Sequence, residues 1–98
     1  MPIDKLDDQA IIQALESLPD WQRDGDHLKA EFVFPNFVAA FAFMTEMAVE
    51  AERLNHHPEW SNVYNRVSIG LTTHDVGGLS QYDVEMAGVM SAGAARHR

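Results

Sequence analysis

Residues 27 to 34 alternate between polar and apolar side chains, and this pattern constrains the fold more than any other part of the chain. Successive side chains of a β-strand point to opposite faces of a sheet, so the alternation predicts a strand with one buried face. The apolar members of the run are Leu28, Ala30, Phe32 and Phe34. The turn sequence Asp24-Gly25-Asp26 precedes this strand, and Trp21-Gln22-Arg23 stands before the turn. Together these runs predict a β-hairpin.

Helical and extended patterns alternate through the rest of the chain. The spacing of apolar residues predicts helices over residues 7–18, 37–55 and 80–94, with Asn36 and Ser80 as N-caps of the last two and a frayed tail after residue 94. Residues rich in β-formers predict two further strands, over 60–64 and 66–73. The order α-β-β-α-β-β-α predicts an α+β fold, with a four-stranded antiparallel sheet and helices packed on one face.

The long helix predicted over residues 37–55 carries both apolar and charged stripes. Its expected buried face consists of Phe37, Phe41, Met44, Ala48 and Ala51. Ala40, Met47 and Leu54 widen this face. Its expected solvated stripe consists of Glu46, Glu50 and Arg53. Glu52 falls outside that stripe, at the edge of the expected apolar face, where a carboxylate either extends outwards or serves a function.

The length and charge of the chain limit the classes of function that it can have. Its 98 residues suffice for a single domain, 1–98, with a small core that a second subunit would help to cover. A net charge of −8 argues against nucleic-acid or anionic-membrane surfaces. The absence of cysteine excludes disulfides and thiolate chemistry. Without a recognisable signal peptide or long apolar run, we expect a cytoplasmic protein.

A group of ionisable side chains lies at the end of the long helix. Glu52 and His56 are four residues apart, so they share one face if the helix continues that far. A carboxylate beside an imidazole fixes its tautomer and favours its charged form, which suits a proton carrier; the alternative is an ordinary surface pair at a helix end. Pro58 disfavours helical geometry at His57, so the two imidazoles are expected to point apart.

Further polar and aromatic residues follow within the next strands. His74 ends the last predicted strand, where a side chain can face a cleft or lie on an exposed loop. Asp83 stands three residues after Ser80, so a capping box also explains its carboxylate. Trp60 and Tyr64 share one strand parity and fit either a pocket or a core or interface.

Three histidines in one region also raise the alternative of a zinc site. The spacing does not favour it, because histidine pairs two or four residues apart are missing and the adjacent His56 and His57 diverge. The sequence therefore predicts no metal and favours acid–base chemistry.

The spacing of the whole set is more specific than any of its parts. The pattern Glu-x3-His-His-Pro-x5-Tyr-x9-His-x8-Asp, together with the segments around it, closely resembles the pterin-4a-carbinolamine dehydratase family. The resemblance covers nearly all of the chain. Its matching positions are Glu52, His56, His57, Pro58, Tyr64, His74 and Asp83, and the resemblance extends to the segments Leu54–Val67, Thr72–His74 and Gly78–Ser80.

This resemblance implies a hydro-lyase that dehydrates 4a-hydroxytetrahydropterin to quinonoid dihydropterin in tetrahydrobiopterin recycling, without a metal or organic cofactor. It implies His56, His57 and His74 as the acid–base set, with Glu52 positioning His56. Pro58, Trp60, Tyr64 and Asp83 would support the site or bind substrate. The implied partners are the pterin, a second or further copies in a homodimer or homotetramer, and an aromatic amino-acid hydroxylase.

One position departs from the family pattern. Well-known animal members carry an arginine directly before the final aspartate, where this chain has Tyr82. The alternative function is a non-catalytic binding module, because animal members also act as dimerisation cofactors of a homeodomain transcription factor. The presence of all three histidines favours catalysis.

Overall fold

The computed structural model describes residues 3–98 and confirms the predicted order of helices and strands. The first two residues of the predicted 1–98 domain lie outside the described part. Within residues 3–98, none of the helices has the length and apolar character needed to cross a membrane. The elements are α1 (Asp8–Leu15), β1 (Gln22–Asp24), β2 (His27–Val33), α2 (Phe37–Leu54), β3 (Glu59–Val63), β4 (Arg66–Leu71), the 3₁₀ helix η1 (His74–Val76) and α3 (Gln81–His97).

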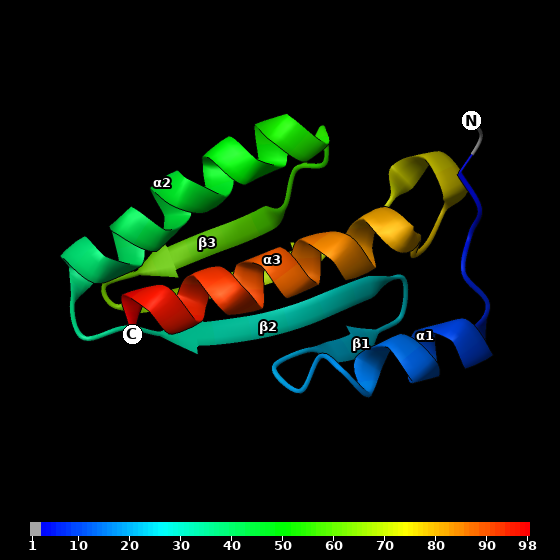
Figure 1. Ribbon diagram of the computed structural model, residues 1–98, viewed down its shortest axis with the longest axis horizontal. Helices are drawn as coiled ribbons and strands as arrows, with labels where there is room; N and C mark the ends of the chain where they lie inside the picture. The colour runs from blue at the N-terminus through cyan, green and yellow to red at the C-terminus, as the bar shows by residue number, and fades with distance from the viewer. Residues whose placement is uncertain (1–2) are drawn as a thin grey trace.

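The four strands form one antiparallel sheet in the order β1-β2-β4-β3. The hairpin predicted around Gly25 is confirmed, with Asp24 paired to His27 and Gly25 at a positive φ of 61°. Helices α2 and α3 pack against each other over the same face of the sheet (Figure 1). The predicted α+β architecture is therefore confirmed.

The core lies between the sheet and these helices. Opposed pairs such as Leu28–Leu71 and Phe32–Val67 direct their side chains to the helical face. The indole N–H of Trp21 donates to Ser91 Oγ at 2.9 Å, which ties the segment after α1 to α3. The buried apolar residues that the helices add are Ile11, Ala40, Phe43, Met47, Ala51, Met86, Ala87, Met90 and Ala94.

The predicted buried face of α2 is partly wrong. Of the five residues named for it, only Ala51 is fully buried, and Phe37 and Phe41 are 47% and 54% exposed. The stripe that packs on the core is rotated and consists of Ala40, Phe43, Met47 and Ala51. Apolar residues surround so much of this helix that periodicity alone could not tell the core face from an uncovered apolar face.

The two ends of α2 have well-formed caps. Asn36 Oδ1 accepts from the backbone N–H of Ala39 at 2.8 Å, which confirms the predicted N-cap. At the other end Asn55 is left-handed (φ 53°). The N–H of His56 donates to Ala51 O at 2.9 Å and the N–H of Asn55 to Glu52 O at 3.2 Å, which is a Schellman motif. The helix therefore ends before the two histidines.

Helix α3 continues further than predicted. The capping box of Ser80 and Asp83 is present, but the helix runs to His97 instead of fraying after residue 94. The reason is Glu46 of α2, which binds Arg96 and accepts from His97 Nε2 at 2.7 Å. Glu46 thus faces α3 and does not belong to a solvated stripe, contrary to the prediction.

Candidate active site

A buried polar contact joins His56 to Asp83. His56 follows the end of α2, and Asp83 lies in the first turn of α3 with no exposed surface. His56 Nε2 is 2.6 Å from Asp83 Oδ1. An ionised carboxylate only accepts hydrogen bonds, so His56 donates from Nε2 in this contact.

One hydroxyl group and one backbone N–H hold the second oxygen of Asp83. Asp83 Oδ2 accepts from Thr73 Oγ1 at 2.7 Å and from the backbone N–H of Ser80 at 2.9 Å. Thr73 has one hydroxyl proton, which goes to Asp83, so the Ser80 hydroxyl donates across the 2.7 Å contact to Thr73 Oγ1. Every buried polar side-chain atom among the described residues has a partner. The network fixes the Asp83 carboxylate beneath His56.

The predicted pairing of Glu52 with His56 is wrong. Glu52 Oε1 is 2.7 Å from Nε2 of His57, and both side chains are exposed. The Schellman motif explains why Glu52 pairs with His57 and not with His56, because it turns His56 away from the surface of α2 and towards Asp83 of α3. His57, which precedes Pro58, then points back towards Glu52. The prediction that the two imidazoles diverge is met, with different carboxylate partners.

All three predicted catalytic histidines line one cavity of about 450 Å³. His56 and His57 come from the α2–β3 connection, and His74 comes from the beginning of η1. His74 is the most exposed of them, with 83% of its side-chain surface accessible, and its Nε2 lies 3.3 Å from Glu59 Oε2. The full lining is Leu54, Asn55, His56, His57, Thr72, Thr73, His74, Asp75 and Tyr82.

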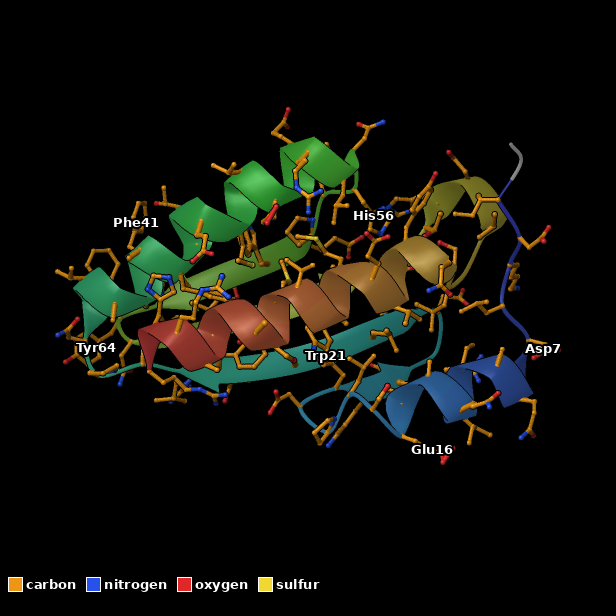
Figure 2. The ribbon with its side chains drawn as sticks, in the orientation of Figure 1. Asp7, Glu16, Trp21, Phe41, His56 and Tyr64 are labelled. Carbon is orange, nitrogen blue, oxygen red and sulfur yellow. The ribbon has the colours of Figure 1, made fainter. Side chains whose placement is uncertain are left out.

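The predicted supporting residues are not all near this cavity. Asp83 lies directly behind His56, and Pro58 joins the histidine pair to β3. Trp60 is half-buried and packs against the core instead of lining the cavity. Tyr64 is 62% exposed in the β3–β4 turn, with φ of 51°. Figure 2 shows Tyr64 at the left end of the molecule, well away from His56, and Tyr64 does not line the histidine cavity.

Tyr82, the residue that departs from the family pattern, belongs to the cavity. Its ring centroid lies 5.7 Å from that of His56, with the planes inclined by 37°. The side chain is partly exposed and forms one wall beside the buried imidazole. An aromatic ring with a hydroxyl group therefore stands where an arginine side chain would have carried a positive charge.

Three imidazoles in one cavity form an arrangement that is suited to proton transfer. His56, His57 and His74 each have Nε2 next to a carboxylate oxygen, of Asp83, Glu52 and Glu59 in that order. Histidine is the side chain that most often serves as a general acid or base. Among residues 3–98, no three His, Asp or Glu side chains are grouped as metal ligands.

Sequence reasoning missed Thr73 and Glu59 as parts of this region. Thr73 stands directly before His74, and the Ser80–Asp83 capping spacing indicated a carboxylate at the start of α3, but no local pattern joined these positions. Glu59 directly follows Pro58 at the beginning of β3, and no local pattern linked it to His74. The Thr73 contacts form across the loop between β4 and α3, and the Glu59 contact joins the beginning of β3 to the beginning of η1.

Comparison with known proteins gives a consistent result. The family model described as "Pterin 4 alpha carbinolamine dehydratase" matches residues 4–92. A protein of Rhizorhabdus wittichii named "Putative pterin-4-alpha-carbinolamine dehydratase" is 55% identical over 94 residues, covering 94% of this chain and 97% of its own.

Two solved structures resemble the fold. A "transcriptional coactivator/pterin dehydratase" from Brucella melitensis has a TM-score of 0.91 and 40% identity, covering 93% of this chain and 99% of its own. A pterin dehydratase-like protein identified as a RuBisCO assembly factor in the alpha-carboxysome has a TM-score of 0.63 at 23% identity, over 76% of this chain and 86% of its own, and shows the fold alone. By sequence and by structure, this chain belongs to the pterin 4 alpha carbinolamine dehydratase family.

Proposed function

We propose that this chain dehydrates 4a-hydroxytetrahydropterin to quinonoid dihydropterin by histidine acid–base catalysis, without a metal or organic cofactor. The observation that carries the proposal is the single cavity lined by His56, His57 and His74. The membership in the family supplies the substrate class. In this proposal the substrate comes from an aromatic amino-acid hydroxylase, and the reaction belongs to cytoplasmic recycling of tetrahydrobiopterin.

The reaction requires two proton transfers at different atoms of the pterin. One proton goes to the 4a-oxygen as the bond from C4a to oxygen breaks and water leaves. One proton is taken from the pterin ring nitrogen system as the quinonoid double bonds form. Each positioned acid or base of this kind typically contributes about 10²–10⁴-fold to the rate.

The burial of the histidines divides their roles. His57 and His74 are exposed to the cavity and can reach a bound ligand, so we assign the acid at the 4a-oxygen to one of this pair. His56 is 8% exposed and tied to Asp83, which suits it to hold the pterin through its Nδ1. Glu52 holds His57 by its Nε2.

The test compares His57→Ala and His74→Ala with wild type in a dehydration assay. We expect kcat to fall about 10²-fold or more in each variant, with folding unchanged by circular dichroism. His97→Ala is the matched control, because this histidine pairs with Glu46 outside the cavity and its loss leaves the site intact. Wild-type kcat in both cavity variants would remove these histidines from the mechanism.

Self-association is part of the proposal. Phe37, Phe41, Thr45 and Val49 follow one another every four residues along α2 as an exposed, uncharged row. A second copy of this chain is the occupant that we propose for it. Each copy carries a net charge of −8, so two copies meet most readily on surfaces that lack charge. Light scattering should show a dimer or tetramer at micromolar concentration, and a monomer alone would contradict this.

The second candidate function is a non-catalytic binding module that stabilises a protein partner. The same exposed row on α2 favours it. The dehydration assay separates the two candidates. A well-folded wild-type chain without any dehydration activity would support the binding module.

A further inference from the structure

Glu59 links two histidines that belong to different parts of the fold. Its Oε1 is 3.0 Å from Nε2 of His27 on β2, and its Oε2 is 3.3 Å from Nε2 of His74 at the beginning of η1. Glu59 itself is the first residue of β3. His27 and Glu59 also line a wide depression of about 830 Å³ on the sheet face that the helices leave open. The three side chains thus connect that face to the histidine cavity.

The contact between His27 and Glu59 crosses an entire strand. β2 and β3 are not neighbours, because β4 lies between them. Gly70 of β4 is paired with Glu59 on one side and with Lys29 on the other. A Cβ added to Gly70 would lie 3.5 Å from His27 Cδ2, so a larger side chain would occupy the path between the two residues. Glycine weakens a strand interior, and here it leaves the gap through which His27 reaches Glu59.

The carboxylate has little freedom once His27 holds it. Ionised Glu59 only accepts hydrogen bonds, so His27 donates from Nε2 and fixes Oε1. Lys29, two residues after His27 on β2, is engaged by Asp24 at 3.1 Å. The free oxygen of Glu59 is left beside His74, whose side chain is 83% exposed and is not fixed by packing.

We propose that Glu59 is a positioning residue for His74 and that His27 holds Glu59 in place. This inference rests on the proposed dehydration and adds the device that orients one of its histidines. With Nε2 of His74 kept at the carboxylate, the ring presents Nδ1 to the cavity for proton transfer. His57 also has a carboxylate at this ring nitrogen, with its Nε2 at 2.7 Å from Glu52 Oε1.

The alternative is that the contacts of Glu59 with His27 and His74 are surface ion pairs that only stabilise the sheet. Exposed pairs of this kind contribute about 0–1 kcal/mol. A surface ion pair predicts a small change in melting temperature and no change in kcat. A positioning role predicts that kcat falls when Glu59 is substituted, so kcat separates the two alternatives.

The decisive substitution is Glu59→Gln, with Glu31→Gln as the matched control. Glu31 is another exposed carboxylate on the same open face, and it lies 3.8 Å from Arg66 and accepts from Ser68. In Glu59→Gln the amide oxygen accepts from His27, which turns the NH₂ group towards His74. A donor at that place favours a His74 ring with its proton on Nδ1 instead of Nε2.

Two measurements are made on each variant. Long-range ¹H–¹⁵N correlation spectra should show the neutral His74 ring protonated on Nε2 in wild type and Glu31→Gln, and on Nδ1 in Glu59→Gln. Steady-state kinetics should show kcat reduced about tenfold or more in Glu59→Gln, with KM changed by less than about twofold. His27→Ala should lower kcat in the same direction by a smaller factor.

The outcomes separate this inference from the proposed function. An active wild type, with unchanged kcat and unchanged His74 spectrum in Glu59→Gln, overturns the positioning role and leaves the dehydratase proposal standing. An inactive wild type overturns the dehydratase proposal, and the spectrum of His74 then decides alone whether Glu59 sets its tautomer. Equal effects in Glu31→Gln would show a general charge effect and also overturn the inference.

Discussion

Replacing Asp83 by Ala should damage the protein more than any other single change at the site. The carboxylate accepts from His56 Nε2, Thr73 Oγ1 and the N–H of Ser80, and it has no exposed surface. After the substitution, Thr73 can turn its hydroxyl to Ser80, and His56 can find water in the cavity. The N–H of Ser80 keeps no acceptor, and α3 loses half of its capping box.

The loss of stability follows from these parts. A buried donor without a partner costs about 1–3 kcal/mol. A lost cap costs about 1 kcal/mol. A hydrogen bond to a charged group contributes about 1.5–3 kcal/mol, and the contact from His56 to the Asp83 carboxylate is lost. We therefore expect Asp83→Ala to lower the free energy of unfolding by about 3 kcal/mol or more, which corresponds to a fall in Tm of about 12 °C or more in a domain of this size.

Urea denaturation followed by circular dichroism, at one fixed protein concentration, measures this difference. Asp26→Asn in the exposed β1–β2 turn is the control and should stay within about 0.5 kcal/mol of wild type. Asp83→Asn keeps the shape of the side chain, so it should lose less stability than Asp83→Ala. Its amide nevertheless disturbs the tautomer of His56 and should lower activity. A loss below about 1 kcal/mol in Asp83→Ala would refute the view that this buried network holds the start of α3.

The remaining predictions concern the beginning of α2 and the contact of Glu46 with the end of α3. Hydrogen bonds from His97 and then Arg96 hold the pKa of Glu46 below its usual value. A lowered carboxylate pKa gives stability that is complete above the unfolded-state pKa and lost as the pH falls through the folded-state pKa. Glu46→Gln should thus melt below wild type at pH 7, with the two melting temperatures converging in the acid range; a constant gap would contradict this. Asn36→Ala should cost about 1 kcal/mol in urea denaturation, whereas Asn36→Asp should not, and equal losses would argue against the cap.

The order of elements could be predicted because each one has a local cause. The alternation in β2, the Asp-Gly turn and the caps at Asn36 and Ser80 act over a few residues, and each appears as predicted. The buried face of α2 and the length of α3 could not be predicted in this way. Apolar residues surround much of α2, and the final turn of α3 is held by Glu46, about 50 residues away in the chain.

The site was predictable in its members and less so in its pairings. The three histidines share one cavity as expected, but their carboxylate partners depend on the Schellman turn at Asn55 and on the packing of α3. Glu52 therefore binds His57, and Asp83 binds His56. The chain from His27 through Glu59 to His74 needs three strands in register, which no short pattern contains.

Dehydration of 4a-hydroxytetrahydropterin by the wild-type chain is the measurement that bears most directly on the proposed function. The reaction is followed by absorbance in a buffer that contains a metal chelator, against the spontaneous reaction in the same buffer. We expect a rate that rises in proportion to protein concentration and is unaffected by the chelator. A rate equal to the spontaneous one, or activity that appears only when zinc is restored, would contradict metal-free catalysis by His56, His57 and His74.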